Sequence, residues 1–197
     1  MTNNDPIIFN RKLVRLHRER AVCLRGDDFL LKEMAQRICD KLTELNSNFP
    51  MVLDLGAHGG TFGRMAAGQF GIKTLIQSDI STGMLSHAQG LRMAADEELL
   101  PFAENSFDLC ITSGSLHWVN DLPGTLIQVR RALKQGGVLI AILPGGETLK
   151  ELRQSFEKAE MDISGGISPR VSPFVDAREM GALLGRAGFK HPVIDTE

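Results

Sequence analysis

A glycine-rich turn between two acidic residues is the first feature of the chain that could bind a ligand. The turn reads Asp54-Leu55-Gly56-Ala57-His58-Gly59-Gly60, and Asp79 follows 25 residues after Asp54. Glycine lets backbone N–H groups approach a ligand closely, and a carboxylate that closes the next strand can accept both hydroxyls of a ribose. Together they predict a ribose-bearing cofactor. The alternatives are a tight strand-to-helix turn and an N-cap at Asp79 for the next helix.

The spacing of the glycines excludes two other ligand-binding turns. No Gly-Lys-Ser/Thr follows, so the turn is not a P-loop. The dinucleotide fingerprint counted from Gly56 needs glycine where the chain has His58 and Thr61. The turn alone therefore does not identify the cofactor.

A third acidic segment follows the next predicted strand and reads Asp96-Glu97-Glu98-Leu99-Leu100-Pro101-Phe102. A carboxylate at this place could accept a hydrogen bond from the exocyclic amine of an adenine. Leu99 and Phe102 could cover the ring. The alternative is an ordinary acidic turn.

Alternating strand and helix patterns determine where these residues lie. Apolar segments predict strands at 51–55, 74–78, 91–95, 107–113 and 138–143, with a last candidate at 192–196. Helical patterns lie before, between and after them, at 28–45, 61–69, 84–89, 122–135, 148–159 and 177–187. Thr148 and the Asp176–Glu179 pair are the expected caps of the last two helices. This order predicts an α/β fold, a mostly parallel sheet with helices on both faces, and a ligand beyond the carboxyl ends of the strands.

Composition excludes several classes of protein. The chain has 197 residues, of which 43% are hydrophobic and 23% charged, which argues against a disordered or fibrous protein. A net charge of -2 gives no general affinity for nucleic acid. No apolar run is long enough for a transmembrane segment. The three cysteines are widely spaced and predict reduced thiols in a cytoplasmic protein.

Charge is nonetheless uneven along the chain. Residues 9–25 carry six basic side chains and one acidic one, and residues 96–108 carry five acids and no base. Two solvated faces would explain this pattern. The basic segment could instead be a lid or docking arm, and it also resembles an organelle transit peptide.

The chain resembles class I S-adenosylmethionine (SAM)-dependent methyltransferases. Within that superfamily it is most similar to bacterial relatives of the mitochondrial complex I assembly factor with a methyltransferase fold, which has arginine hydroxylase activity. It is more distantly similar to the malonyl carrier-protein methyltransferase of biotin synthesis. The resemblance covers nearly the whole chain and rests on the segments 9–12, 54–60, 79, 96–102, 105–109, 115–122, 133–137, 145–153, 165–174 and 184–189.

The resemblance implies a single Rossmann-like domain over residues 1–197, with a helical arm at 1–48 and the core at 49–197. It also implies S-adenosylmethionine as cofactor. Gly56 and Gly60 would lie against its methionine end, Asp79 would bind the ribose and Asp96 the adenine amine. The remaining residues of the expected cofactor site are Asp54, which would orient the turn, and Ala57, His58, Ile80, Glu97 and Ser113.

Two departures from the family pattern are expected to matter. His58 stands where the family has glycine, so its side chain could crowd the methionine end, or could point outward and cap the next helix. A left-handed backbone there would cost about 1–2 kcal/mol. The family also continues past Glu197, and its antiparallel C-terminal strand is expected to be missing here. An open edge at 138–143 could then support a dimer.

No catalytic residue is evident from the pattern, because methyl transfer needs mainly an in-line approach of a nucleophile. His117 is the one weak candidate for a general base, and Trp118 would form a pocket wall. No metal site is expected. Three functions compete: a methyltransferase acting on a small molecule or carrier-bound acid, an assembly-factor-like protein that hydroxylates an arginine of a respiratory-complex subunit, and a non-catalytic scaffold with this fold.

Overall fold

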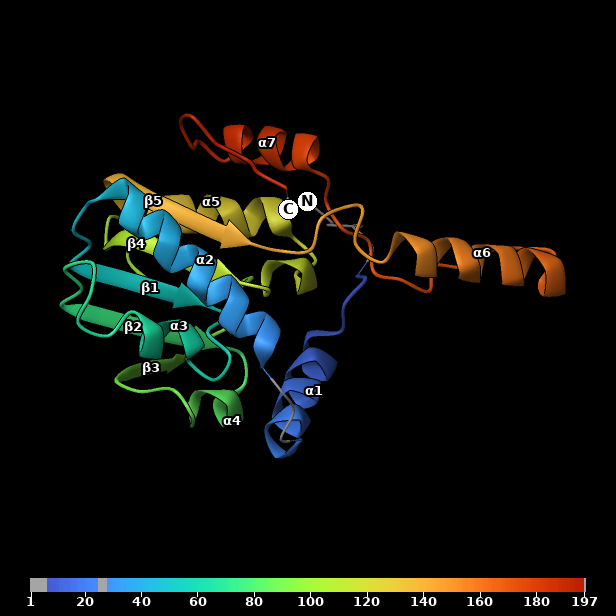
Figure 1. Cartoon of the computed structure of the whole chain (residues 1–197), viewed down its shortest axis with the longest axis horizontal. Helices are drawn as coiled ribbons and strands as arrows, with labels where there is room; N and C mark the ends of the chain where they lie inside the picture. Colours follow the sequence, from blue (N-terminus) through green and yellow to red (C-terminus); the bar gives the residue numbers. More distant parts are fainter. Residues whose placement is uncertain (1–6, 25–27, 197) are drawn as a thin grey trace. The chain divides into compact units, whose positions relative to one another are not determined.

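A computed structural model describes residues 7–24 and 28–196 (Figure 1). Its contacts divide the chain into two compact units, Met1–Leu143 and Pro144–Glu197. The first holds every strand of the described residues and all the residues predicted to bind a cofactor. The second holds two helices.

A five-stranded sheet forms the centre of the first unit. Its strands are β1 (Met51–Leu55), β2 (Thr74–Asp79), β3 (Leu91–Ala94), β4 (Phe107–Ser113) and β5 (Leu133–Ile142). Their order in the sheet is β3-β2-β1-β4-β5, and every neighbouring pair is parallel. The chain therefore changes direction of winding between β1 and β4, which is where α/β sheets bind ligands. The predicted Rossmann-like α/β fold is confirmed.

Helices follow the strands as the sequence predicts. The first unit contains α1 (Arg11–Cys23), α2 (Phe29–Leu45), α3 (Thr61–Met65), α4 (Thr82–Leu85), a 3-10 turn at Leu116–Trp118 and α5 (Leu122–Ala132). Figure 1 shows α2 lying across the strands. Its apolar stripe packs on the sheet through Ala35, Ile38 and Leu42, each at most 1% exposed. Burial of this stripe holds α2 over β1 and β4.

Strand β5 begins five residues earlier than predicted, at Leu133. The predicted helix ends at Ala132 because Leu133 already pairs with Phe107, and the register shifts before Leu109 pairs with Val138. Gly136, with φ +77°, lies in this irregular stretch of β5. In this stretch Lys134 Nζ lies 2.8 Å from the Asp108 carboxylate.

Other boundaries also differ from the prediction. Helix α3 ends at Met65 rather than Gln69, because the chain turns at Gly68 with φ +74°. Helix α4 covers Thr82–Leu85 rather than 84–89. The last predicted strand, 192–196, is wrong: these residues form no strand, and Val193 is 91% exposed. Without a neighbouring strand, an apolar pattern has nothing to pair with.

The second unit contains α6 (Lys150–Ser164) and α7 (Ala177–Arg186). Asp176 caps α7 as predicted, because its carboxylate accepts the N–H of Glu179 at 2.7 Å. The cap expected at Thr148 is wrong, since α6 starts after Leu149 in a left-handed conformation. The following loop is tied back to α6, where Glu160 accepts from Ser168 and Arg170.

No helix in residues 7–24 and 28–196 combines the length and apolar character needed to cross a membrane. Within the same residues, β3 and β5 are the two edges of the sheet, and no antiparallel strand lies beside β5.

Candidate functional site

A small cavity lies beyond the carboxyl ends of β1 and β4. Five of its lining residues are ones the sequence singled out: Asp54, Gly56, Ala57, His58 and Ser113. The other lining residues are Leu31 and Ala35 of α2, and Thr61 and Phe62 of α3. The sheet topology thus brings together residues up to 59 positions apart in sequence, Asp54 and Ser113, at the predicted ligand position.

The backbone of the glycine-rich turn needs glycine at two positions. Gly56 and Gly60 have φ of +71° and +74°, a region that other residues rarely adopt. A Cβ on Gly56 would lie 2.2 Å from the side chain of Ser115, and one on Gly60 would lie 2.8 Å from Ala88. The N–H groups of Gly56 and Ala57 both donate to the carbonyl oxygen of Ser78 in β2. The end of β2 therefore holds the turn in place.

Two buried polar atoms of the cavity have no hydrogen-bond partner among the described residues: Asp54 Oδ2 and Ser113 Oγ. Burial raises the pKa of Asp54 to about 8, and the neighbouring charge of Asp79 acts in the same direction. An unpaired carboxylate oxygen in a buried site is costly, and a cationic ligand group would compensate it. The cavity therefore fits a ligand that brings an ammonium group and a hydrogen-bond donor.

The side chain of His58 points into this site. Its Nε2 lies 3.2 Å from the carbonyl oxygen of Ser113, and its backbone φ is +49°. The left-handed backbone foreseen at this position is present, and the alternative of an outward-pointing cap is wrong. Burial, helped by the charge of Arg18, lowers the pKa of His58, so its ring is neutral at neutral pH.

Asp79 lies at the end of β2 and is completely buried. Its Oδ2 accepts hydrogen bonds from the N–H of His58 at 3.0 Å and from Arg18 Nη1 at 2.9 Å. Its Oδ1 accepts the N–H of Ser81 at 2.8 Å. The N-cap of α4 is Ser81, so the capping alternative for Asp79 is wrong. Ile80, between these two residues, is half-buried.

The acidic segment after β3 lies against α1. Glu97 is completely buried, and its carboxylate accepts from Arg18 Nη1 at 3.0 Å, from Arg11 and from Ser115. Burial opposes its ionisation, but Arg18 and Arg11 hold the pKa of Glu97 below its usual value. Asp96 is more exposed and accepts from Arg11 Nη2 at 2.7 Å. The acidic segment is therefore an ion-paired cluster rather than an ordinary acidic turn.

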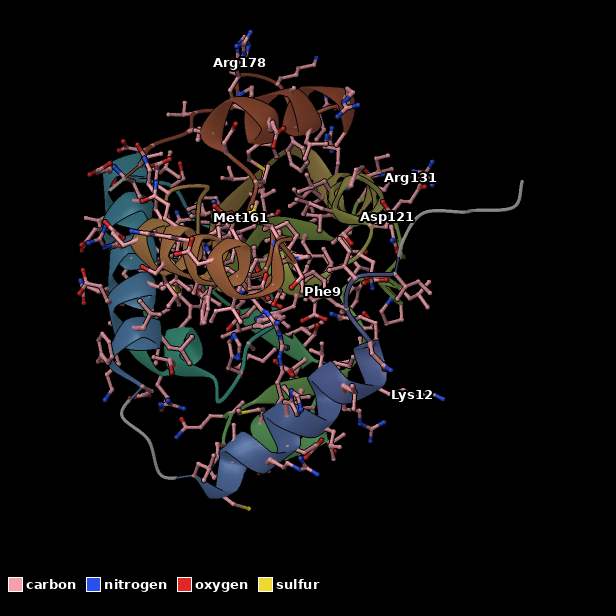
Figure 2. The ribbon with its side chains drawn as sticks, turned by 90° about the vertical axis from the view of Figure 1, so that its right-hand side faces the viewer. Phe9, Lys12, Asp121, Arg131, Met161 and Arg178 are labelled. Carbon is pink, nitrogen blue, oxygen red and sulfur yellow. The ribbon has the colours of Figure 1, made fainter. Side chains whose placement is uncertain are left out.

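Sequence reasoning did not assign Arg11 and Arg18 to the site, although it flagged the basic segment that contains them. Both arginines of α1 donate to the Glu97 carboxylate, while Lys12 points away from the fold (Figure 2). The solvated-face interpretation is wrong for Arg11 and Arg18, because both pair with buried or half-buried carboxylates, and the lid or docking arm stays a prediction. The signal for this pairing was present as the match between one basic and one acidic segment.

His117 lies on the 3-10 turn after β4, next to Trp118 with ring centroids 4.9 Å apart. Burial lowers the pKa of His117 to about 4, and the nearby Arg18 and His58 act in the same direction. The imidazole is neutral at neutral pH and a weak base. In the described residues, no three histidine, cysteine, aspartate or glutamate side chains gather as a metal site.

The sequence is similar to that of known proteins that share this fold. Residues 53–141, from β1 to β5, match the model of a methyltransferase domain. The chain is 33% identical over 212 residues to a malonyl-[acyl-carrier protein] O-methyltransferase of Gallionella capsiferriformans, covering 98% of this chain and 70% of that protein. The chain belongs to the class I SAM-dependent methyltransferase superfamily. It is also 43% identical over 175 residues to the human mitochondrial arginine-hydroxylase NDUFAF5, covering 86% of this chain and 50% of that protein.

Four vertebrate arginine-hydroxylases named NDUFAF5 match this chain. The chain spans only 50% to 61% of their lengths.

Solved structures share the fold. A chain from the complex of the Haloferax volcanii Trm112 methyltransferase activator with a putative methyltransferase superposes with a TM-score of 0.70 at 21% identity. That match covers 89% of this chain and 75% of the solved one.

The cavity can be compared with the cofactor that this superfamily uses. The methionine end of SAM carries an ammonium group, which suits Asp54 Oδ2, and Ser113 Oγ lies in the same cavity. At the nucleoside end the carboxylates are present, but Arg11 and Arg18 occupy much of their hydrogen-bonding capacity. At the methionine end Asp54 and Ser113 offer acceptors that suit SAM, although the ring of His58 lines the same cavity. At the ribose end Arg18 occupies the Asp79 carboxylate.

Proposed function

We propose that this chain binds S-adenosylmethionine beyond β1 and β4 and transfers its methyl group to a nucleophilic acceptor. The observation that supports this most directly is the unpaired, buried Asp54 carboxylate oxygen beside the glycine turn. A structural carboxylate would be expected to have its partners within the fold. This one faces a cavity at the ligand position of an α/β sheet.

Five of the predicted cofactor residues have a place in this proposal. Asp54 and Ser113 would hold the amino-acid end, and Gly56, which lines the same cavity, would lie against it. Asp79 would accept the ribose hydroxyls, and Asp96 the adenine amine. Bound SAM would supply an electrophilic methyl group on a sulfonium sulfur. The chain's own contribution is to fix this cofactor in a buried site that excludes water, so that an acceptor can approach in line.

The residues near the site favour an acceptor that is already nucleophilic and needs no general base. Removing a proton from the acceptor would require a general base with a pKa near 7. His117, with a pKa of about 4, is too weak a base for this role. A carboxylate acceptor needs no base. The similarity to a malonyl-[acyl-carrier protein] O-methyltransferase supports an acid as the acceptor class.

A second candidate is hydroxylation of an arginine side chain in a protein partner such as a respiratory-complex subunit. The observation that favours it is 43% identity to the human arginine-hydroxylase NDUFAF5. A scaffold without catalysis is the third candidate, and it is favoured by the ring of His58 in the cavity. We further propose that the chain is cytoplasmic and forms a single domain. We also propose that it can dimerise through an open edge of the sheet.

Product analysis tests the three candidates. The purified chain is titrated calorimetrically with SAM and with S-adenosylhomocysteine, then incubated with SAM and candidate acceptors, and in parallel with the acceptors, O2 and a reductant. Methyl transfer produces S-adenosylhomocysteine and adds a methyl group, whereas hydroxylation adds one oxygen atom to an arginine. SAM binding without either product favours the scaffold. A folded chain that does not bind SAM contradicts the methyltransferase proposal.

A further inference from the structure

Helix α1 inserts one arginine into the predicted ribose site. The Arg18 side chain is 9% exposed and lies between Asp79 and Glu97, whose side chains are 0% and 1% exposed. Its Nη1 is 2.9 Å from Asp79 Oδ2 and 3.0 Å from Glu97 Oε1, and its Nη2 is 3.1 Å from Ser115 Oγ. Arg18 therefore bridges the ends of β2, β3 and β4 in the place where a ribose is expected.

Counting acceptor sites shows that Arg18 and a ribose compete. A carboxylate has about four lone-pair sites. On Asp79, three are taken, by the N–H groups of His58 and Ser81 and by Arg18. A ribose diol brings two O–H donors, so one acceptor site is too few. Because the two backbone N–H groups are fixed by the turn and by α4, Arg18 is the donor that must leave.

The adenine site differs in this respect. Asp96 Oδ1 accepts from Arg11 Nη2 at 2.7 Å and from the N–H of Glu98 at 2.9 Å, while Oδ2 accepts only the longer contact of 3.2 Å from Arg11 Nε. Oδ2 keeps a free lone pair for an adenine amine. Arg11 can therefore stay in place when a nucleoside binds.

The start of α1 is also fixed by contacts outside the site. The side-chain oxygen of Asn120 accepts the N–H groups of Ile8 and Phe9 at 2.9 and 2.8 Å. The ring of Phe9 packs edge-on against Trp118, with centroids 5.4 Å apart. The far half of α1 is also held by Glu19, whose carboxylate accepts the N–H of Gly83 at 3.1 Å and the hydroxyl of Thr82 at 3.3 Å.

We propose that α1 is a strap whose Arg18 occupies the ribose position of the cofactor site, so that SAM binds only when the second half of α1 lifts while its start stays attached. This inference rests on the proposed function. It makes Arg18 an internal competitor of the cofactor, and Arg11 part of the fixed end. The apparent affinity for SAM is then reduced by the fraction of chains whose strap is closed.

The chain carries its own pair of optical reporters for this motion. Trp118, the single tryptophan in a sequence without tyrosine, lies beside the fixed end of α1. Cys23 ends α1 and is exposed, whereas Cys39 and Cys110 are buried. A fluorophore attached to Cys23 can therefore accept energy from Trp118. We expect this energy transfer to change when SAM is added, and to follow the same titration curve as SAM binding.

The test compares three variants with the parent in calorimetric titration with SAM. Arg18→Met removes the competitor and is expected to bind SAM about tenfold more tightly, the scale of one charge-assisted hydrogen bond. Glu19→Ala loosens the strap without touching the carboxylates of the site, and is expected to gain about threefold. Arg20→Met removes an exposed charge from the same helix and is the matched control, with no expected change.

The outcomes separate this inference from the proposed function. Tighter binding by Arg18→Met, or by Glu19→Ala if the first variant does not fold, with an altered energy-transfer signal, supports the strap. If the parent binds SAM and both variants bind it equally or more weakly, the strap is refuted and the proposed function stands. If neither the folded parent nor either variant binds SAM, both are refuted.

Discussion

The imidazole of His58 and the carbonyl oxygen of Ser113 lie 3.2 Å apart and join the turn after β1 to the end of β4. These are the two strands between which the winding of the sheet reverses. The contact therefore joins two lining residues of the cavity, and His58 stands where the family pattern has glycine. It comes with a left-handed backbone at His58, with φ +49°, that a glycine would adopt without strain.

Replacing His58 separates backbone strain from crowding. His58→Gly and His58→Ala both lose the contact with Ser113, but only alanine keeps the strain. We therefore expect His58→Ala to be less stable than His58→Gly by about 1 kcal/mol, measured by urea unfolding. Both variants should bind SAM more tightly than the parent, because both empty the methionine end. Unchanged affinity in both would mean that the ring does not obstruct the cofactor.

Asp54 should make stability depend on pH in a defined direction. Its pKa of about 8 in the fold lies above the value of about 4 for an unfolded chain. Between these values the folded chain holds a proton that the unfolded chain has released. The contribution of Asp54 to the free energy of unfolding therefore falls as pH rises from about 4 to about 8.

The variant Asp54→Asn tests this direction. Its free energy of unfolding, minus that of the parent, should increase with pH by up to about 1.4 kcal/mol per unit below about pH 8, then level off. Urea unfolding at several pH values measures this difference. The same substitution at the exposed Asp162 is the control for changing total charge. A difference that does not vary with pH would show that Asp54 is ionised in the fold.

Asp79→Ala should weaken SAM binding by about 1–3 kcal/mol, because the ribose loses charge-assisted hydrogen bonds. The same change also leaves Arg18 with one buried partner fewer, and we expect a stability loss of about 3–5 kcal/mol. Calorimetry on the folded variant and urea unfolding measure the two effects separately.

Asp108→Ala is the matched control for Asp79→Ala. Asp108 also accepts from a basic side chain and a backbone N–H, from Lys134 Nζ and from Met51, each at 2.8 Å. It lies near the start of β4, away from the carboxyl ends of the strands. It should lose stability without losing affinity for SAM. Equal SAM binding by Asp79→Ala and the parent would refute the ribose assignment.

The two central strands, β1 and β4, could be predicted because they are short, apolar and almost entirely buried. β1 and β4 have the expected bounds, and β2 and β3 differ by one residue at the end. β5 could not be bounded, since its first residues are set by pairing with Phe107 rather than by their own apolar pattern. The strand predicted at 192–196 failed for the opposite reason, because these residues have an apolar pattern but no neighbouring strand to pair with.

Only the residues of the site that follow the carboxyl ends of the strands could be predicted from the sequence. The cavity gathers Asp54, Gly56, His58 and Ser113 because parallel strands end at one edge of the sheet. The ion pairs of Arg18 with Asp79 and Glu97 join residues 61 and 79 positions apart. The matching basic and acidic segments indicate that the two can pair, but which residues meet depends on how α1 docks.

His117 should contribute little to the pH dependence of methyl transfer near neutrality. With a pKa of about 4, set by burial and by the charge of Arg18, the imidazole is neutral across the range from about pH 6 to pH 8. Rate–pH profiles of the parent and of His117→Gln should therefore have the same shape, with a rate loss of less than about tenfold from altered packing against Trp118. The control is Trp118→Phe, which changes the neighbouring ring and leaves the imidazole. A profile of the parent that bends near pH 6.5 and loses this bend in His117→Gln would restore His117 as the general base, and would show that acceptor binding raises its pKa.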